Sequence, residues 1–348
     1  MKLLVTGGAG FIGSALIRNA IAAGRKVVNV DKLTYASSLG SLVNVANSKH
    51  YQFEKVDICV TGAMAQLLAK HKPDAVMHLA AESHVDRSID KPSEFIQTNI
   101  VGTYQLLEAT REYYNSLRGE KKNNFRYHHV STDEVFGSLS MDEPAFTPNT
   151  PYDPRSPYSA SKAASDHLAL SWFHTYELPV VLSNCSNNYG PFQFPEKLIP
   201  LMIIKALNKH PLPIYGNGEN VRDWLHVNDH ATALLRVLDY GKLGESYLVG
   251  ANAQRSNIDV VRAICTLMDE AQGFGPHENQ ITFVKDRPGH DHRYAIDATK
   301  IRNELDWQPS ISFEEGLKQT VHWYLTNQKW WQPLMKKNHF GKRLGLGT

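Results

Sequence analysis

The residues with the greatest chemical potential lie in two neighbouring segments, Ser131-Thr132-Asp133-Glu134 and Tyr158-Ser159-Ala160-Ser161-Lys162. On a helix Tyr158 and Lys162 would share one face, at about 6 Å between their Cβ atoms. A phenol beside an ammonium can serve as the base for hydride transfer if its pKa is lowered from about 10. Asp133 and Glu134 are unnecessary for redox chemistry alone, so they indicate an additional acid/base step such as removal of water.

The two carboxylates suit an elimination next to a ketone. Oxidation of a sugar C4 hydroxyl would acidify the hydrogen on C5, which Glu134 could remove while Asp133 protonates the departing C6 hydroxyl. The enone would then take the hydride at C6 and a proton from Glu134 at C5, so the net change is loss of water. The structural alternatives are that the carboxylates cap the next element or stay solvated, and that Tyr158 and Lys162 make surface helix contacts.

A glycine-rich turn, residues 7–13, lies between a predicted strand over 2–6 and a predicted helix over 14–24. In such a turn the backbone N–H groups and the helix N-terminus can meet a pyrophosphate. Asp31 ends the next predicted strand, where its carboxylate can accept hydrogen bonds from an adenosine ribose diol. This favours NAD over NADP, although the adjacent Lys32 leaves NADP open. The structural alternative is a plain turn with a solvated Asp31.

The elements that must position these residues alternate along the first half of the chain. Predicted strands end at Thr6, Asp31, Asp57, Ala81 and Ser131, each followed by a helical or turn pattern. Such a series predicts right-handed βαβ crossovers and an α/β, Rossmann-like doubly wound parallel sheet. Asp57 and Ile58, and Leu79, Ala80 and Ala81, would then lie at its carboxyl edge.

The sequence pattern changes after Asn187: the predicted elements become shorter and are separated by prolines, and Gly216-Asn217-Gly218 marks a tight turn. We interpret this part as a second, smaller α/β substrate-binding lobe. Residues 1–186, with 221–250 returning to them, are expected to form the NAD-binding domain. Residues 187–220 and 251–348 are expected to form mainly the other lobe.

Composition excludes several classes of protein. Lys and Arg total 37 against 35 Asp and Glu, without a basic block, so no nucleic-acid partner is expected. No apolar run suits a signal peptide or a membrane span of about 18 residues, so we expect a cytoplasmic protein without membrane contact. Cys59, Cys185 and Cys265 are far apart, which favours buried, inert thiols over disulfides or zinc. His290 and His292 lack partners with zinc-like spacing, so no metal is expected.

The chain resembles the extended short-chain dehydrogenase/reductase superfamily and, more narrowly, the dTDP-glucose 4,6-dehydratase family. The resemblance runs nearly end to end and rests on long motifs. These motifs are segments 5–13, 78–88, 131–135, 156–163, 185–191, 221–224 and 286–291. The resemblance implies an NAD-dependent hydro-lyase of nucleotide-sugar metabolism, in deoxysugar biosynthesis, that converts dTDP-glucose to dTDP-4-keto-6-deoxyglucose and water.

The resemblance also implies a set of site residues. Catalytic roles are expected for Thr132, Asp133, Glu134, Tyr158 and Lys162. Cofactor contacts are expected from Gly7, Gly10, Phe11, Ile12, Gly13, Asp31, Lys32, Thr34, Asp57, Ile58, Leu79, Ala80, Ala81, Tyr158 and Lys162. Nucleotide-sugar contacts are expected from Ser83, Thr132, Asn187, Lys197, Tyr215, Arg222, Asn257, Arg287 and His290.

Two of these positions can also be argued from chemistry. The guanidinium groups of Arg222 and Arg287 suit diphosphate oxygens, although without the resemblance both would be interpreted as ion-pair residues.

Three alternatives remain in view. A sugar-nucleotide 4-epimerase would share the glycine turn, Tyr158 and Lys162, but usually has small residues in place of Asp133 and Glu134. A GDP-mannose 4,6-dehydratase usually lacks the aspartate. From a different class, a non-catalytic NAD-sensing module would have no reason to combine all five catalytic residues. The resemblance further implies a homodimer joined by helices of the first lobe, for which the apolar face of the predicted helix over 94–114 could serve; equally, that face could be core.

Overall fold

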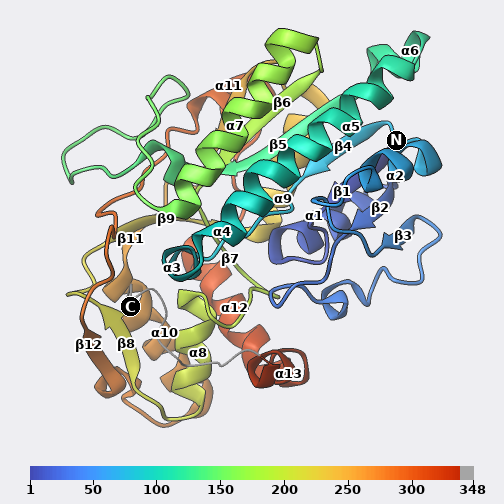
Figure 1. Ribbon diagram of the computed structural model, residues 1–348. Coiled ribbons are helices and arrows are strands. Elements are labelled where there is room, and N and C mark those ends of the chain that lie inside the picture. Colours follow the sequence, from blue (N-terminus) through green and yellow to red (C-terminus); the bar gives the residue numbers. More distant parts are fainter. Residues whose placement is uncertain (338–348) are drawn as a thin grey trace.

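The computed structural model describes residues 1–337, which are built around a seven-stranded, entirely parallel β-sheet (Figure 1). The strand order is β10-β6-β5-β4-β1-β2-β3. Strands are added outward from β1 first on one side and then on the other, which confirms the predicted doubly wound sheet. The strands are β1 (Lys2–Thr6), β2 (Lys26–Val30), β3 (Tyr51–Glu54), β4 (Ala75–His78), β5 (Arg126–Thr132), β6 (Val180–Cys185) and β10 (Ser246–Val249).

Consecutive strand residues contribute to two hydrophobic cores on opposite faces of this sheet. In β1, Leu3 and Val5 pack with one set of helices, whereas Leu4 packs with the other. This follows from the two-residue period of a strand, and it explains why β1 is apolar at consecutive positions. The first face is covered by α1 (Phe11–Ala22) and α9 (Val227–Tyr240), and the second by α2 (Ala63–His71), α5 (Thr103–Ser116) and α7 (Pro157–Tyr176).

The predicted helix over 94–114 is interrupted by a π-helical segment, Ile96–Gly102. Within it the buried Asn99 donates from Nδ2 to the Glu82 carbonyl oxygen at 3.0 Å and to the Ser161 Oγ at 2.8 Å. Its Oδ1 accepts from the Glu82 N–H at 2.9 Å. The wider turn therefore fastens the segment after β4 to α7, and π-segments of this kind are frequent at functional sites.

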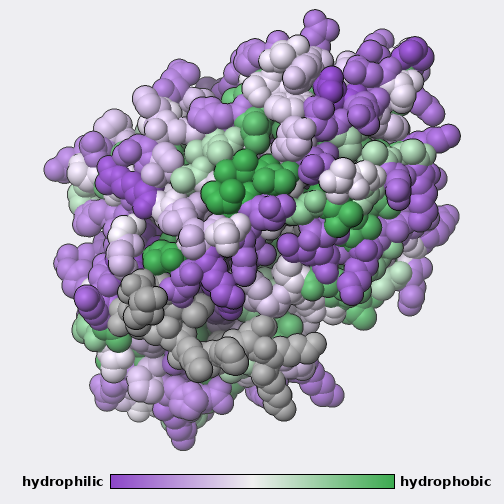
Figure 2. Space-filling model, in the orientation of Figure 1, coloured by the Kyte–Doolittle hydropathy of each residue, from purple (hydrophilic) through white to green (hydrophobic). Residues whose placement is uncertain are grey.

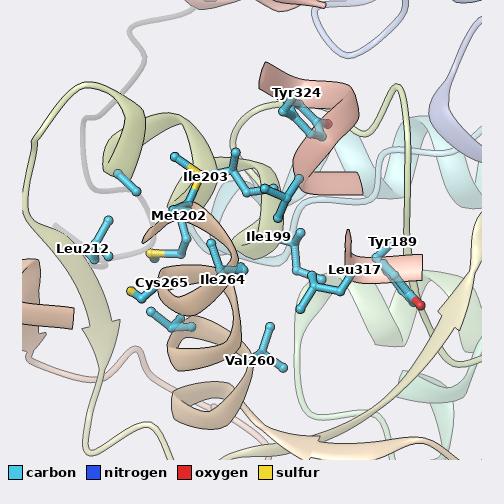
Figure 3. Close-up of a cluster of buried hydrophobic side chains, with 14 of the residues drawn as sticks. Tyr189, Ile199, Met202, Ile203, Leu212, Val260, Ile264, Cys265, Leu317 and Tyr324 are labelled. Atoms are coloured by element: carbon cyan, nitrogen blue, oxygen red, sulfur yellow. The ribbon is translucent and has the colours of Figure 1, made fainter. Parts of the chain in front are cut away.

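The second lobe has its own hydrophobic core, in which Met202, Ile203, Ile264, Leu317 and Tyr324 are buried together (Figure 3). Its helices are α8 (Leu198–Leu207), α10 (Asn257–Gln272), α12 (Phe313–Thr326) and α13 (Gln328–Lys337). Its strands form a parallel pair, β8 (Leu212–Tyr215) with β12 (Ile281–Val284), and a three-stranded sheet of β7 (Asn187–Tyr189), β9 (Val221–His226) and β11 (Gln254–Ser256).

Shorter elements complete the structure. The helices are α3 (Val85–Asp90), α4 (Pro92–Phe95), α6 (Gly119–Asn123) and α11 (Thr299–Leu305), and the 3₁₀ turns are Leu39–Leu42, Asp133–Phe136 and His277–Gln280. Cys185 and Cys265 are buried, whereas Cys59 is only half-buried, and all three are free thiols. Among residues 1–337, no helix has the length and apolar character needed to cross a bilayer.

The contacts of the returning segments refine the division into lobes, which we propose as follows. Helix α9 and strand β10 belong to the large sheet, but β9 pairs with β7 and β11 instead. Ile301 and Leu305 of α11 pack with Val181 and Tyr247, on the side of the large sheet. We therefore assign 227–250 and 299–307 to the dinucleotide side and the rest of 187–337 mainly to the substrate lobe. The remainder of the expected lobe, 338–348, lies outside the described residues.

Candidate active site

The glycine-rich turn between β1 and α1 borders a cavity of about 300 Å³ at the carboxyl edge of the sheet. Gly7 has a φ of +70°, and a Cβ there would lie 2.7 Å from the backbone N and Cα of Ala80. A Cβ on Gly13 would lie 2.2 Å from the carbonyl oxygen of Gly7. Only glycine permits this packing, which leaves the backbone of the turn at the cavity wall.

All fifteen positions expected to contact the cofactor line this cavity, as do the five expected catalytic residues, two of which are common to both sets. Asp31, at the end of β2, is buried and fixed, because Oδ2 accepts from the Ala9 N–H at 3.0 Å and Oδ1 accepts from the Leu33 N–H at 2.8 Å. The Lys32 ammonium pairs with Asp57 at 3.6 Å. A fixed carboxylate suits the hydroxyls of an unphosphorylated ribose and would repel a 2′-phosphate. The cradle therefore fits a dinucleotide such as NAD.

Strand β5 and helix α7 bring the five expected catalytic residues together. Thr132 ends β5, and its Oγ1 accepts from the Glu134 N–H at 3.2 Å, which starts the 3₁₀ turn carrying Asp133 and Glu134. Helix α7 begins with a capping box in which Ser156 and Ser159 exchange side-chain to backbone hydrogen bonds. The cap fixes the start of the helix and therefore the positions of its buried residues Tyr158 and Lys162.

Nearby charges separate the expected roles of the two buried carboxylates. The pKa of Asp133 lies well above its usual range because the side chain is buried and because Glu134 and Asp223 add negative charge nearby. Burial also raises the pKa of Glu134, but the positive charges of Arg287, Lys197 and Arg222 oppose that rise. Asp133 is thus suited to hold a proton that it can donate, and Glu134 is suited to take one.

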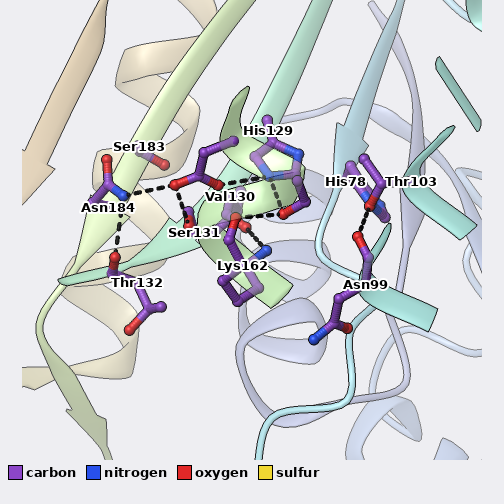
Figure 4. A network of polar contacts seen from close by, with 12 residues as sticks. His78, Asn99, Thr103, His129, Val130, Ser131, Thr132, Lys162, Ser183 and Asn184 are labelled. Carbon is purple, nitrogen blue, oxygen red and sulfur yellow. Dashed lines mark hydrogen bonds and ion pairs between the residues drawn. The ribbon is translucent and has the colours of Figure 1, made fainter. Parts of the chain in front are cut away.

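Tyr158, as the expected base for hydride transfer, has the opposite requirement, because a base must first lose its own proton. Burial and the nearby charge of Glu134 raise the pKa of Tyr158 well above its usual value, while a hydrogen bond with Thr132 lowers it. The Lys162 ammonium donates to the Val130 carbonyl oxygen at 3.0 Å (Figure 4). Positive charge beside the phenol is therefore needed before Tyr158 can ionise, and a bound nicotinamide cation and Lys162 are the sources that this site offers.

A second cavity, of about 720 Å³, lies between the lobes and shares part of its wall with the first. Glu134 lines both cavities, so they meet at the acid/base pair. The eight substrate positions other than Thr132 all line the second cavity: Ser83, Asn187, Lys197, Tyr215, Arg222, Asn257, Arg287 and His290.

The two arginines in this cavity are held by protein groups. Arg222 is buried, donates from Nη1 to the Val221 carbonyl oxygen at 2.7 Å and from Nη2 to that of Asp291 at 2.9 Å, and lies over the Tyr294 ring. Arg287 donates from Nη1 to the Asp86 Oδ1 at 2.7 Å. Because neutral carbonyls do not cancel the charge of Arg222, this side chain adds positive charge to the cavity wall, whereas Arg287 is paired with Asp86.

Sequence reasoning did not single out several residues that shape this site. Asp86 accepts from Arg287 and also from the Tyr215 hydroxyl at 3.0 Å, so it joins two expected substrate residues. Glu196 lines both cavities and accepts from the Arg87 Nη2 at 2.9 Å. The available signal was that Asp86 and Arg87 belong to the motif 78–88, but their partners are distant in sequence. Among residues 1–337, no cluster of His, Cys, Asp and Glu is arranged to bind a metal ion.

The parallel sheet, the glycine turn and the Tyr-x-x-x-Lys helix place the chain in the extended short-chain dehydrogenase/reductase class. Within that class the chain belongs to the family described as GDP-mannose 4,6 dehydratase, whose sequence model matches residues 4–320.

Individual relatives narrow the comparison. The chain is 56% identical to dTDP-glucose 4,6-dehydratase of Neisseria meningitidis serogroup B over 352 residues, which cover 99% of each chain. The crystal structure of dTDP-glucose 4,6-dehydratase from Bacillus anthracis in complex with NAD is similar, with a TM-score of 0.85, 43% identity and coverage of 96% of this chain and 99% of that one. The same enzyme from Streptomyces venezuelae, solved as a double mutant with NAD and DAU bound, has a TM-score of 0.87, 41% identity and coverage of 96% and 100%.

Proposed function

We propose that the protein is an NAD-dependent hydro-lyase that converts dTDP-glucose to dTDP-4-keto-6-deoxyglucose and water. The observation that carries this proposal is the position of Asp133 and Glu134, with pKa values raised by burial, where the dinucleotide cavity meets the substrate cavity. The full-length identity to dTDP-glucose 4,6-dehydratases supports the substrate.

The first step is oxidation at C4 of the sugar. NAD, when bound, supplies a hydride acceptor for C4 and later the hydride for C6. Tyr158 takes the proton of the C4 hydroxyl, and Thr132, which contacts Tyr158, is placed to hold the same hydroxyl. Lys162 is buried in the cavity wall. It supplies positive charge for the phenolate and is in place to hold the nicotinamide ribose.

The second step is elimination, for which the C4 ketone acidifies C5. Glu134 removes the C5 proton as Asp133 protonates the C6 hydroxyl, which leaves as water. After hydride return to C6, Glu134 gives its proton back to C5. Tyr158 has then gained one proton and Asp133 has lost one, so release of a proton by Tyr158 and uptake of one by Asp133 restore the site.

The decisive experiment is incubation of the protein with dTDP-, UDP-, CDP- and GDP-hexoses, followed by mass detection of a product lighter by one water. Loss of water from dTDP-glucose, with little from the others, is the expected result. An epimerised product of unchanged mass, or a clear preference for another nucleotide, would contradict the proposal.

We further propose a cytoplasmic homodimer joined through α5 and α7. On these helices Tyr104, Trp172 and Tyr176 form a row with ring centroids 6.0 and 5.3 Å apart. Tyr104 and Tyr176 are each 42% exposed, and Ile96, at the start of the π-helical segment that precedes α5, is 47% exposed. Figure 2 has an apolar patch over the region where α5 and α7 lie in Figure 1. Exposed apolar area on two parallel-packed helices suits a matching helix pair from a second copy.

A further inference from the structure

A buried carboxylate, Asp166, lies directly behind the catalytic strand and is not among the residues that touch either cavity. Its Oδ1 accepts from the His129 Nε2 at 3.0 Å. Its Oδ2 accepts from the Ser131 Oγ at 2.8 Å, the Tyr152 hydroxyl at 3.0 Å and the Asn184 Nδ2 at 3.2 Å. A carboxylate that accepts four hydrogen bonds is held rigidly in place.

This network fixes the last two residues of β5. Ser131 is held by its hydroxyl, and Asn184, while bound to Asp166, also donates to the Thr132 carbonyl oxygen at 3.1 Å (Figure 4). The next residues in the chain are Asp133 and Glu134. Asp166 itself lies on α7, so it ties the acid/base pair to the helix that carries Tyr158 and Lys162. Catalysis depends on such alignment, because misplacement by about 1 Å can reduce a rate by about 100-fold.

Asp166 also provides a charge for Lys162, one helical turn earlier on α7. Burial lowers the pKa of Lys162, and the negative charge of Asp166 raises it. The hydrogen bond of the ammonium to the Val130 carbonyl oxygen does not balance its charge. The other titratable groups that face Lys162 or Asp166 are His78, His129, Tyr152, Tyr158 and Cys185.

Those other groups are neutral when the site is at rest. Burial lowers the pKa of His78 and His129, so both imidazoles are uncharged. Burial raises the pKa of Tyr152, Tyr158 and Cys185, so these keep their protons. Within the described residues, Asp166 is therefore the carboxylate whose charge favours the ammonium form of Lys162.

We propose that Asp166 is a positioning residue for the reaction: its carboxylate fastens the end of β5 to α7 and keeps the Lys162 ammonium charged. The inference rests on the proposed function, since it assigns Asp166 to the C4 oxidation that needs Lys162 and to the elimination that needs an aligned Glu134.

The test is the pH profile of bound NADH formation, followed by stopped-flow absorbance after mixing the NAD-loaded protein with dTDP-glucose. In Asp166→Asn, which preserves volume, we expect the alkaline limb to move to lower pH by about one unit, because Lys162 then loses its proton more easily. Tyr152→Phe removes a hydrogen bond but keeps the carboxylate, so its alkaline limb should stay in place. Superimposable limbs for wild type and Asp166→Asn would overturn the proposal.

A second variant, Asn184→Ala, tests the positioning role without changing charge. It frees the Thr132 carbonyl, and we expect kcat to fall several-fold while KM and the alkaline limb stay the same. A lowered Tm with unchanged kcat would overturn the proposal whether or not Asp166→Asn folds. Wild-type protein runs in parallel, and its failure to form NADH from dTDP-glucose would refute the proposed function itself.

Discussion

At the scale of single residues, the two adjacent carboxylates Asp133 and Glu134 have different surroundings, which suit the different roles that we propose for them. Asp133 lies against Asp223 and is buried, whereas Glu134 faces three basic side chains across the substrate cavity. Their types and adjacency could be interpreted from the sequence. The basic residues that surround Glu134 come from positions 197, 222 and 287, and only folding makes them neighbours.

Replacement of the base should separate oxidation from elimination. In Glu134→Gln we expect C4 to be oxidised while the C5 proton stays in place, so reduced cofactor accumulates and kcat falls by about 10²- to 10⁴-fold. Absorbance at the NADH wavelength, with mass analysis of the sugar, checks this. Normal turnover in this variant would show that another group is the base.

The pH dependence of elimination should reflect the burial of Glu134. Only the ionised carboxylate can take a proton, so the rate falls as pH drops through the raised pKa of Glu134. The acid limb should therefore lie above the usual glutamate pKa of about 4.3. At saturating substrate, Arg287→Gln removes a positive charge that lowers this pKa and should move the limb to still higher pH. Measurement of single-turnover water loss against pH tests both statements; a limb that moves downward would refute them.

Asp86 is expected to act on binding and not on chemistry. In Asp86→Asn the restraint on Arg287 and Tyr215 is weakened, so we expect KM for dTDP-glucose to rise about tenfold with kcat little changed. Steady-state kinetics measures the two constants separately. A fall in kcat at unchanged KM would place Asp86 in the chemical steps.

At the scale of elements, the strand, turn and helix order was predictable because strands such as β1, β2 and β4 are short, mainly apolar runs that end at a turn signal. The π-helical interruption at 96–102 was not, since it depends on what Asn99 meets in space: the Glu82 backbone and Ser161. The same holds for β9, whose mixed polar and apolar residues do not indicate which sheet it joins. Its pairing with β7 and β11 is decided by tertiary contacts.

The glycine turn offers a matched pair of substitutions. Gly7 and Gly24 have φ values of +70° and +76°, but a Cβ on Gly7 would meet the Ala80 backbone whereas one on Gly24 meets nothing within 4 Å. Gly24→Ala should therefore cost about 1 kcal/mol of stability, from backbone strain alone, and retain NAD. Gly7→Ala should lose most of its bound NAD, as measured by isothermal titration. Equal NAD affinity in the two variants would contradict this account of the turn.

At the scale of the whole molecule, one sheet and one smaller lobe produce two cavities that share a wall. The presence of a second lobe could be predicted from the shorter, proline-separated elements after Asn187. The return of residues 299–307 to the large sheet could not be predicted. Ile301 and Leu305 follow an ordinary helical pattern, and only the partner surface around Tyr247 decides where that helix packs.

The proposed dimer can be tested by a single substitution that places a negative charge in its interface. Tyr104→Glu places a carboxylate in the exposed aromatic row of α5 and α7, so we expect it to weaken self-association by at least about tenfold, because an unpaired charge would be desolvated. Phe283→Glu, at a 60% exposed position on β12, is the control and should leave association unchanged. Sedimentation velocity distinguishes the species. Identical behaviour of the two variants would place the interface elsewhere.

The shared wall at Glu134 bears on how the rate of the proposed reaction would depend on the supply of substrate and cofactor in the cell. Because the expected dinucleotide and sugar cavities share wall residues, the proposed reaction can return the electrons removed from a sugar to that same sugar before either ligand leaves. Each catalytic cycle is then redox-neutral. Flux through the proposed reaction would follow the supply of nucleotide sugar and be indifferent to the ratio of oxidised to reduced dinucleotide in the cell.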